Sequence, residues 1–267
     1  MSAADMSSFK PASAIRLRVP YALLTLIALL IVWQVAVMVA RLPDYLLPSP
    51  ATIITSLYDL SGLLVYHTWI TLVEVVLGFI VAFLVAVPLA TLICYSKLFE
   101  RSVYPLIVGS QTIPKVAIAP LLLAAFGYGL VPKVTIVALM AFFPMVINTV
   151  VGLRSVSQEM IYLSQSMGAS PMQQFFRFRM PGALPSMFAG MKMASVLAVI
   201  GAIVAEFVGS NNGLGYVITV AGSNFRMDQQ FAAIVVLSAL GTVIFWIIGL
   251  IERRALPWHK PTQDGGH

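Results

Sequence analysis

Charged residues are scarce in this chain of 267 residues. Asp, Glu, Lys and Arg make up only 10% of it, whereas they make up about 25% of a typical soluble domain. Apolar residues make up 60% of the chain. A soluble globule needs a polar surface, and so few charges cannot supply one. The composition therefore excludes soluble globular, disordered and collagen-like proteins, and it predicts a protein that crosses a membrane several times.

Cysteine and histidine are nearly absent as well. The single cysteine, Cys94, excludes an internal disulfide, and the three histidines form no His-x-x-x-His pair. The sequence contains no Gly-x-Ser-x-Gly motif and no Gly-Lys dipeptide. It therefore has neither a serine nucleophile elbow nor a phosphate-binding loop. We predict no catalytic residue, no metal site and no cofactor, and we expect any energy from a nucleotide to come from another chain.

Six apolar runs are long enough to cross a bilayer as helices, which takes about 20 residues each. They are Tyr21–Ala40, Ile70–Tyr95, Val103–Phe126, Val131–Leu153, Met187–Val208 and Phe231–Ile251. Pro114, Lys115 and Pro120 interrupt the third run. Because proline removes a backbone hydrogen bond, part of this run is predicted to be an irregular segment that lines a cavity. The fold class predicted is an all-α membrane protein with about six transmembrane helices.

The basic residues predict the orientation of these spans. If the N-terminus lies inside, all but four of the 16 Lys and Arg residues fall in inner segments. The four others are Arg41, Lys115, Lys133 and Arg226. Cytoplasmic loops carry an excess of Lys and Arg, so both termini are predicted to be cytoplasmic. The net charge of +6 is assigned to this asymmetry and not to binding of nucleic acid.

This topology divides the chain into five segments. They are a cytoplasmic N-terminal segment (1–20), a first transmembrane helix (21–40), an extracytoplasmic loop (41–66), a transmembrane domain (67–252) and a cytoplasmic tail (253–267). Within the outer loop, an amphipathic helix is predicted from Ala51 to Leu64.

The inner segment between the fourth and fifth spans is long and polar. Met160, Leu163 and Met167 recur there at helical spacing, which predicts one face of a helix that ends at Gly168. A helix that projects from a bundle in this way is typical of a surface that docks another protein. A plain loop between spans is the alternative.

A second short helix is predicted to follow Gly168. Ser170 before Pro171 is a strong start signal, with the serine as N-cap and the proline at the first helical position. This helix is predicted to end near Phe178, because Pro181 and Pro185 follow before the fifth span.

Few polar side chains lie within the apolar runs. Charge in lipid is costly, so such residues usually face a cavity, an interface or the interior of the bundle. Gln111, Lys115 and Glu206 are therefore candidates for a translocation path. Hydrogen bonds between helices are an equal alternative for Glu206, and a role in local structure is an alternative for Lys115. Glu74, near the outer end of its span, is predicted to be exposed or interfacial.

The inner segment 159–181 resembles the docking motif of ABC importer permeases, in which Glu-Ala-Ala-x-x-x-Gly precedes a Phe and a Leu-Pro. Gly168-Ala169 matches its Gly-Ala, and Met180-Pro181 matches its Leu-Pro, whereas Tyr162-Leu163-Ser164 replaces its Glu-Ala-Ala. The resemblance implies that an ATPase docks on the following residues: Glu159, Tyr162, Gly168, Ala169, Ser170, Phe175 and Pro181.

Further motifs between residues 47 and 252 resemble the nitrate/sulfonate/taurine subfamily of these permeases. They are Leu47–Pro50, Thr71-Leu72 with Gly78-Phe79, Gln111–Leu121 with Phe126–Gly129, and Ala205–Phe207 with Gly213–Gly215. The resemblance implies a type I importer permease bundle, MetI-like, in a bacterial inner membrane. Its substrate would be a nitrate-, sulfonate- or taurine-like anion, or a pyrimidine or vitamin precursor.

The resemblance also implies partners. Two cytoplasmic ATPase subunits would dock on the inner segment, an extracytoplasmic binding protein would deliver the solute, and a second permease copy would complete the pathway within the lipid. The rival interpretation is an ion-coupled secondary transporter. It would use Glu206 and Glu74 as ion sites and would not need the docking element.

Overall fold

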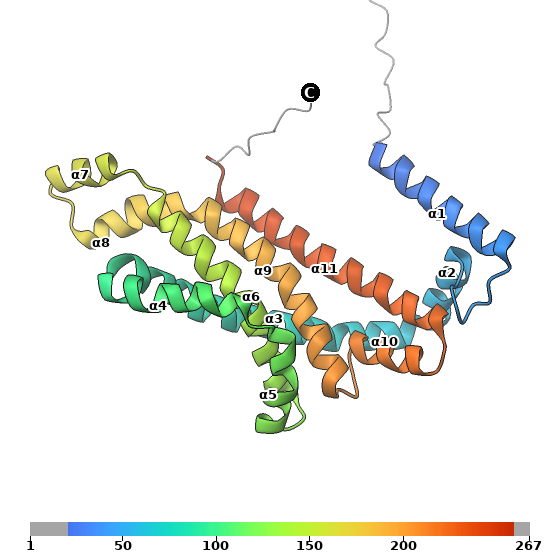
Figure 1. The fold of residues 1–267 in the computed structure, drawn as a ribbon. Coiled ribbons are helices and arrows are strands. Elements are labelled where there is room, and N and C mark those ends of the chain that lie inside the picture. The colour runs from blue at the N-terminus through green and yellow to red at the C-terminus, as the bar shows by residue number, and fades with distance from the viewer. Residues whose placement is uncertain (1–20, 259–267) are drawn as a thin grey trace, which may run out of the picture.

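The computed structural model describes residues 21–258, which are helical and include no strand (Figure 1). The predicted N-terminal segment 1–20 and the end of the predicted tail, residues 259–267, lie outside the described residues. The helices are α1 (Tyr21–Ala40), α2 (Pro50–Asp59), α3 (Ser61–Tyr95), α4 (Lys97–Gly109), α5 (Ala119–Phe126), α6 (Leu130–Arg154), α7 (Gln158–Ser166), α8 (Pro171–Gln174), α9 (Met180–Gly209), α10 (Leu214–Ser223) and α11 (Met227–Ala255). Short 3₁₀ turns, Ser110–Thr112 and Lys115–Ile118, join α4 to α5, and a π-helical turn, Phe175–Arg179, joins α8 to α9.

Within residues 21–258, five helical segments are long and apolar enough to cross a membrane, and the bent pair α4–α5 makes a sixth. These six segments contain the six predicted spans. The third span is broken as expected, since the axes of Lys97–Thr112 and Lys115–Phe126 differ in direction by 91°. Pro114 lies between them in an extended conformation and has no N–H to continue a helix.

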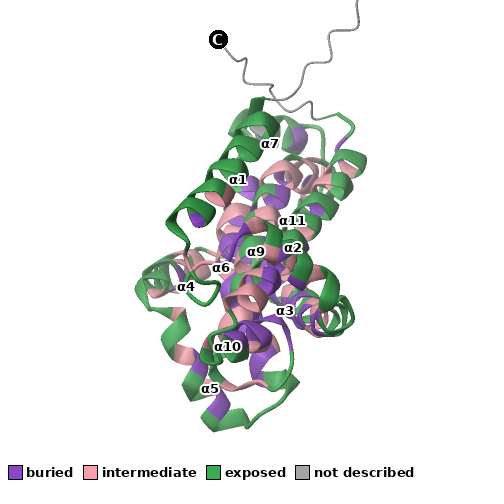
Figure 2. Cartoon of the chain, turned by 90° about the vertical axis from the view of Figure 1, so that its right-hand side faces the viewer, coloured by how far each residue is buried: buried purple, intermediate pink, exposed green. Residues whose placement is uncertain are grey.

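The core lies where α3, α6 and α9 pack against one another, and Figure 2 shows buried residues gathered along these helices. Buried alanines recur at every fourth position on two of them: Ala82, Ala86 and Ala90 on α3, and Ala194, Ala198 and Ala202 on α9. At Gly190 of α9, an added Cβ would lie 2.6 Å from Cβ of Asn148 in α6. Small residues let the backbones approach closely, which is how helices associate in a membrane without a hydrophobic driving force.

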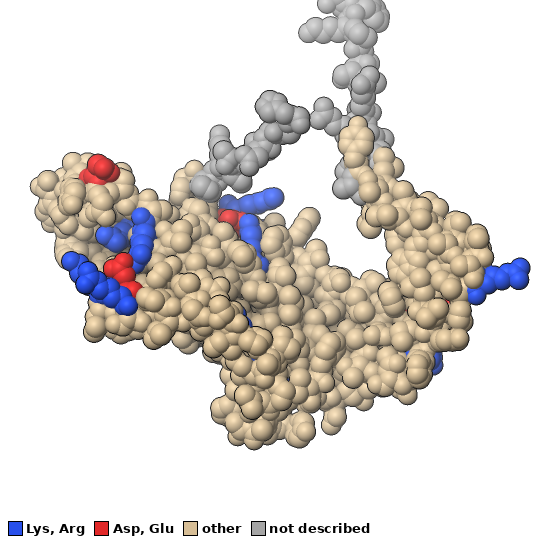
Figure 3. Space-filling model, in the orientation of Figure 1, with Lys and Arg blue, Asp and Glu red and all other residues tan. Residues whose placement is uncertain are grey.

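The two ends of the bundle differ. Helices α7 and α8 project at one end, which we call the α7–α8 end (Figure 1). Helices α2 and α10 lie at the opposite end, which we call the α10 end, together with the loop Ser210–Gly213. On the face shown in Figure 3, charged side chains gather around the α7–α8 end and at other edges of the molecule, and the middle is almost free of them. A band without charges between two polar ends suits a lipid bilayer.

The outer part of α3 departs from the prediction. A continuous helix over Ala51–Leu64 is wrong, because the chain turns at Leu60 (φ −100°, ψ 13°) between α2 and α3. Helix α3 therefore starts at Ser61 and has 35 residues, about 52 Å at 1.5 Å per residue. It is longer than a bilayer is thick, so it extends beyond the apolar layer.

The predicted end of the second docking helix is also wrong. Helix α9 runs through both Pro181 and Pro185 without a stop. Pro181 lies in the first turn of α9, where a missing N–H costs little. The π-helical turn before it widens the backbone and relieves the clash that a proline ring makes with the preceding turn.

Candidate functional site

The helix–glycine–helix element α7–α8 is built by local capping. The Ser157 side chain accepts a hydrogen bond from the backbone N–H of Met160 at the start of α7. At its end, Gly168 takes φ +77°, a left-handed conformation that side chains with a Cβ rarely adopt. The Ala169 N–H then donates to the carbonyl of Ser164 at 3.0 Å and closes the corner. The break predicted at Gly168 is confirmed.

Helix α8 begins with a complete capping box. The N–H of Gln173 donates to Oγ of Ser170 at 3.3 Å, and the N–H of Ser170 donates to Oε1 of Gln173 at 2.9 Å. Pro171 occupies the first turn, where no hydrogen bond is lost. The start signal predicted at Ser170-Pro171 is therefore confirmed, and the geometry of the corner is set by its own residues.

Most large apolar residues of this element are exposed. The side chains that α7 and α8 bury are Ile161, Ser164 and Gln174. Six large apolar side chains stay exposed: Met160, Tyr162, Leu163, Met167, Met172 and Phe176. We call these six residues the exposed apolar surface, and α7 is exposed over most of its length in Figure 2. Exposed apolar side chains on an otherwise polar segment make this surface a candidate interaction site.

The remaining predicted docking residues divide between the surface and the bundle. Glu159 and Gly168 are exposed, whereas Phe175 and Pro181 are half-buried. The Phe175 ring meets Tyr95 of α3 edge-on at 5.8 Å between centroids, so it anchors the element to the bundle. Hydrogen bonds from its own backbone N–H and from the Ser157 side chain hold the pKa of the Glu159 carboxyl below its usual range. Glu159 therefore presents a negative charge near the start of α7.

Two of the candidate path residues lie together at the bend between α4 and α5. Gln111 is exposed. Lys115 is half-buried, with its Nζ 4.4 Å from the centroid of the Phe143 ring of α6. This cation–π contact gives Lys115 the local structural role that the sequence left open, and it keeps a positive charge beside the bend.

Glu206 lies elsewhere, in a buried polar cluster at the α10 end. The cluster consists of His67, Thr71 and Glu74 of α3, Lys133 of α6 and Glu206 of α9. Each of these residues is at most 7% exposed. Lys133 Nζ donates to Glu74 Oε1 at 2.7 Å and to Ser210 Oγ at 2.6 Å. The cluster therefore joins three spans to the loop after α9.

The cluster also caps α10 from outside. Glu206 Oε2 accepts the N–H of Gly215 at 2.5 Å, and Thr71 Oγ1 accepts the N–H of Leu214 at 2.9 Å. His67 Nδ1 accepts the N–H of Gly213 at 2.9 Å. The first N–H groups of a helix have no partner within it, and here side chains of α3 and α9 supply those partners. Glu206 therefore makes the helix-packing hydrogen bonds that were one of its two predicted roles.

The prediction for Glu74 is wrong. Its side chain is 1% exposed and paired with Lys133, not exposed or interfacial. The position of Glu74 near the end of its span suggested an exposed side chain. The ion pair with Lys133 of α6 instead offsets the cost of burying the carboxylate. The sequence does carry a signal for this site, since His67, Thr71 and Glu74 follow helical spacing along one face of an apolar helix.

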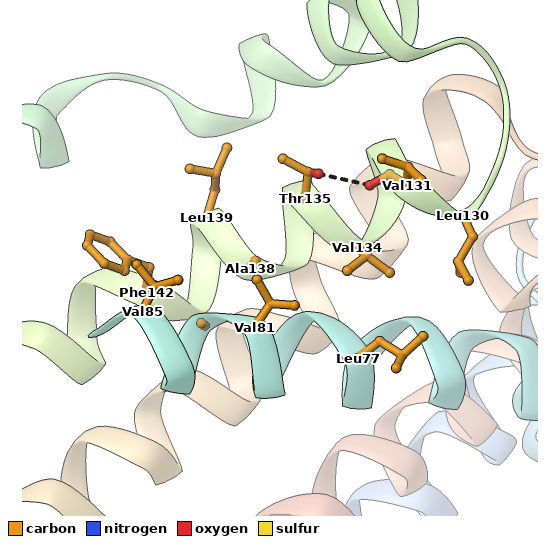
Figure 4. Close-up of a pocket in the computed structure, with 11 residues that line it drawn as sticks. Leu77, Val81, Val85, Leu130, Val131, Val134, Thr135, Ala138, Leu139 and Phe142 are labelled. Carbon is orange, nitrogen blue, oxygen red and sulfur yellow. Dashed lines mark hydrogen bonds between the residues drawn. The ribbon is translucent and has the colours of Figure 1, made fainter. Parts of the chain in front are cut away.

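An apolar groove between α3 and α6 offers no such chemistry. It has a volume of about 610 Å³ and lies between α3 and α6, where Figure 4 shows Leu77, Val81 and Val85 facing residues of α6. The hydroxyl of Thr135, the one polar side chain among its lining residues, donates to the carbonyl of Val131 at 2.9 Å. This groove suits apolar contact and not a polar solute. Among residues 21–258, no group of three or more His, Cys, Asp or Glu side chains could hold a metal ion.

Comparison with known proteins places these features in a family. The sequence profile of the binding-protein-dependent transport system inner membrane components matches residues 74–257. The formylaminopyrimidine transport permease protein of Halalkalibacterium halodurans is 39% identical over 233 residues, which are 87% of this chain and 93% of that protein. The riboflavin transport system permease protein of Chloroflexus aurantiacus is 37% identical and covers 88% of each chain. The taurine transport system permease protein of Escherichia coli is 27% identical and covers 90% of each.

Solved structures agree with the predicted fold. Two structures described as inward-facing conformations of the MetNI methionine ABC transporter match with TM-scores of 0.62 and 0.65. Each match covers 74% of this chain and 98% of the solved chain, at 20% and 21% identity. The predicted type I importer permease bundle is therefore confirmed.

Proposed function

This chain belongs to the family of binding-protein-dependent transport system inner membrane components, and on that premise we propose that an ATPase subunit docks on its exposed apolar surface. The chain is a permease of an ABC importer for small solutes, a transport component and not an ion-coupled transporter. The observation that carries the proposal is the outward-facing apolar side of α7–α8. Its six residues stay exposed among residues 21–258, although the element itself is well capped.

The connection of α8 to the bundle supports a role in coupling. Helix α8, the π-helical turn and α9 form one uninterrupted helical run, Pro171–Gly209. A force applied to α8 therefore acts directly on a membrane span. Phe175, packed against Tyr95, extends this contact to α3. Closure of two ATPase subunits on ATP would then move α9 and α3 as rigid bodies, as alternating access requires.

We assign the two ends of the bundle to the two sides of a bacterial inner membrane. The α7–α8 end faces the cytoplasm, where the excess of Lys and Arg belongs. The α10 end then faces outward and meets the extracytoplasmic binding protein. If the bent pair α4–α5 counts as one span, the chain has six spans and both termini lie in the cytoplasm in this arrangement.

The bend between α4 and α5 is our candidate for the wall of the translocation path. Gln111 and Lys115 place polar groups there, where non-helical backbone at membrane depth requires protein or water beside it. A second copy of the chain would close the path on the other side. Glu206 does not line the path in this proposal. It positions the start of α10 at the outer end through its hydrogen bond with Gly215.

The relatives favour a substrate class. Permeases named for formylaminopyrimidine and riboflavin are 39% and 37% identical to the chain. Those named for aliphatic sulfonates, taurine and nitrate are 26–31% identical. We propose a pyrimidine or related vitamin precursor as the solute, with a small anion as the alternative.

Affinity purification of the tagged chain from its native membrane, followed by mass spectrometry, tests the docking proposal. We expect an ATPase subunit with the wild-type chain and its loss with Gly168→Asp, which alters the corner of α7–α8. Gly62→Asp is a matched control, because Gly62 is an exposed glycine at the opposite end with open space around its Cβ. If no ATPase is recovered under conditions that keep other importers whole, or if both variants retain it equally, the docking proposal is wrong.

A further inference from the structure

The buried polar cluster contains more carboxyl groups than ammonium groups. Glu74 and Glu206 contribute two carboxyl groups, both 1% exposed, and Lys133 contributes one ammonium group. Thr71 of α3 hydrogen-bonds Glu206 at 2.7 Å, and Glu74 lies one turn further along the same face of α3, so the two carboxyl groups lie on the same side of that helix. If both were ionised, like charges would adjoin and the site would carry a net negative charge beside lipid. Carboxyl pairs in this situation retain a proton.

One oxygen of Glu74 lacks a hydrogen-bond donor, and a proton on the other carboxyl group could supply one. Glu74 Oε1 accepts from Lys133, but Glu74 Oε2 is buried and receives no hydrogen bond from the side chains or backbone around it. A buried acceptor without a donor is costly. A protonated carboxyl group on Glu206 would supply the missing donor.

Two neighbours decide which carboxyl group holds the proton. A full positive charge, Lys133 Nζ, lies 2.7 Å from Glu74. Glu206 instead meets the N-terminus of α10, which carries the equivalent of only about half a charge. Glu74 is therefore the stronger acid and stays ionised. His67 adds no charge, because its Nδ1 accepts the Gly213 N–H and so carries no proton.

We propose that Glu206 is protonated and donates to Glu74, and that Glu74, Lys133 and Glu206 form a charge-neutral clasp that positions the segment Ser210–Gly215. Glu206 is thus a positioning residue of the transporter. Its hydrogen bonds do not conflict with this state, since a protonated carboxyl group still accepts through its carbonyl oxygen. The Thr71 hydroxyl lies 2.7 Å from Glu206 Oε1, to which it donates when that oxygen carries no proton. When Oε1 is protonated, the hydroxyl can turn to the carbonyl of His67, 3.2 Å away.

The positioned segment lines a polar pocket at the α10 end. This pocket, of about 220 Å³, is lined by Tyr128, Gly129, Lys133, Gly209, Ser210, Asn211 and Asn212. Lys133 is a member of both the clasp and the pocket wall, so the clasp fixes the shape of the surface that faces the pocket. Loss of the clasp would release the segment and the start of α10 together.

Infrared spectroscopy of the full chain in nanodiscs at neutral pH tests the location of the proton. We expect a carbonyl-stretching band of a protonated carboxylic acid in the wild-type chain, lost in Glu206→Gln and retained in Glu159→Gln, which changes an exposed carboxyl group outside the cluster. A band that persists in Glu206→Gln overturns the proposal. So does the absence of any such band from the wild-type chain.

Hydrogen–deuterium exchange tests the positioning role. The backbone amide of Gly215 should exchange at least about tenfold faster in Glu206→Ala, which removes its acceptor. The amides of Gly213 and Leu214 keep their own acceptors, His67 and Thr71, and should exchange faster only through the loosening of the segment. In Glu206→Gln, which imitates the neutral acid, exchange should stay within about threefold of wild type. Equal exchange in these two variants contradicts the clasp. If Glu206→Ala does not fold, the comparison of Glu206→Gln with wild type still decides, because rapid exchange there contradicts a protonated Glu206.

Discussion

The exposed apolar surface of α7–α8 and the buried polar cluster at the α10 end depart from the usual distribution of side chains in opposite ways. On α7–α8, Met167 and Tyr162 are 80% and 64% exposed although they are apolar. In the cluster, Glu74 and Glu206 are each 1% exposed although they ionise in water. The first region leaves apolar side chains uncovered among residues 21–258. The second region satisfies its polar groups within the chain.

The two regions differ in which contacts hold them: local ones at α7–α8 and long-range ones in the cluster. Hydrogen bonds inside the corner itself hold α7 and α8, so their outward side is free to meet a partner. The cluster instead joins α3, α6, α9 and α10, elements far apart in the sequence. Substitutions that remove a partner from the cluster should therefore destabilise the bundle, whereas substitutions on α7–α8 should leave its stability unchanged and disturb association.

The largest expected effect is that of Lys133→Met. It leaves Glu74 buried without its cation, and removal of one member of a buried pair costs about 3–5 kcal/mol. Unfolding of the purified chain in mixed micelles, with increasing dodecyl sulfate, measures this loss. The double variant Lys133→Met with Glu74→Gln should recover most of it, because no unpaired charge remains. A single variant as stable as wild type would show that the pair does not hold the spans together.

Gly213→Ala should rank next. Gly213 has φ +104°, and an added Cβ would overlap the carboxyl group of Glu206. Strain of this kind costs about 1–3 kcal/mol. The same denaturation assay should show the loss, and faster amide exchange should follow at the start of α10. Gly62→Ala is the control, since a Cβ there meets open space and the helix should gain slightly.

Ser170→Ala should have a smaller and local effect. The substitution removes the acceptor for the N–H of Gln173, and loss of an N-cap side chain costs about 1 kcal/mol. Amide exchange should quicken in α8 and remain unchanged in α3 and α6. Global unfolding at a lower dodecyl sulfate concentration would contradict the claim that the corner is locally built.

Leu163→Ser should barely change stability. Leu163 is 59% exposed, and substitutions at such surface positions stay within about 0.5 kcal/mol. The same variant should nevertheless lose the ATPase subunit on purification. An unchanged yield of the subunit would remove Leu163 from the docking surface. A large loss of folding stability in Leu163→Ser would contradict the claim that α7–α8 contributes little to the stability of the bundle.

Most of the fold followed from composition and from local signals in the sequence. Runs of apolar residues located the six spans, and Pro114 located the break in the third. Gly168 and Ser170 located the corner of α7–α8, because capping depends on residues close in sequence. The continuation of α9 through Pro181 was missed, since a π-helical turn depends on how the neighbouring backbone adjusts.

The buried polar cluster could be foreseen only in part. Helical spacing puts His67, Thr71 and Glu74 on one face of α3, so their proximity was available from the sequence. Their partners lie 59 or more residues away, at Lys133 and beyond, and no local pattern pairs them. From the sequence alone, a single carboxylate near the end of a span is predicted to be exposed. Only the packing of the helices places the Lys133 cation beside Glu74.

Photocrosslinking at Met167 tests the central claim most directly. A photoreactive amino acid at this position, which is 80% exposed, lies at the corner of α7–α8. Tyr58 of α2, at the other end and 82% exposed, serves as the control position. After irradiation of native membranes, we expect an adduct with the ATPase subunit at Met167 and none at Tyr58. If Met167 yields no ATPase adduct, or if both positions yield it equally, the exposed apolar surface is not the docking site.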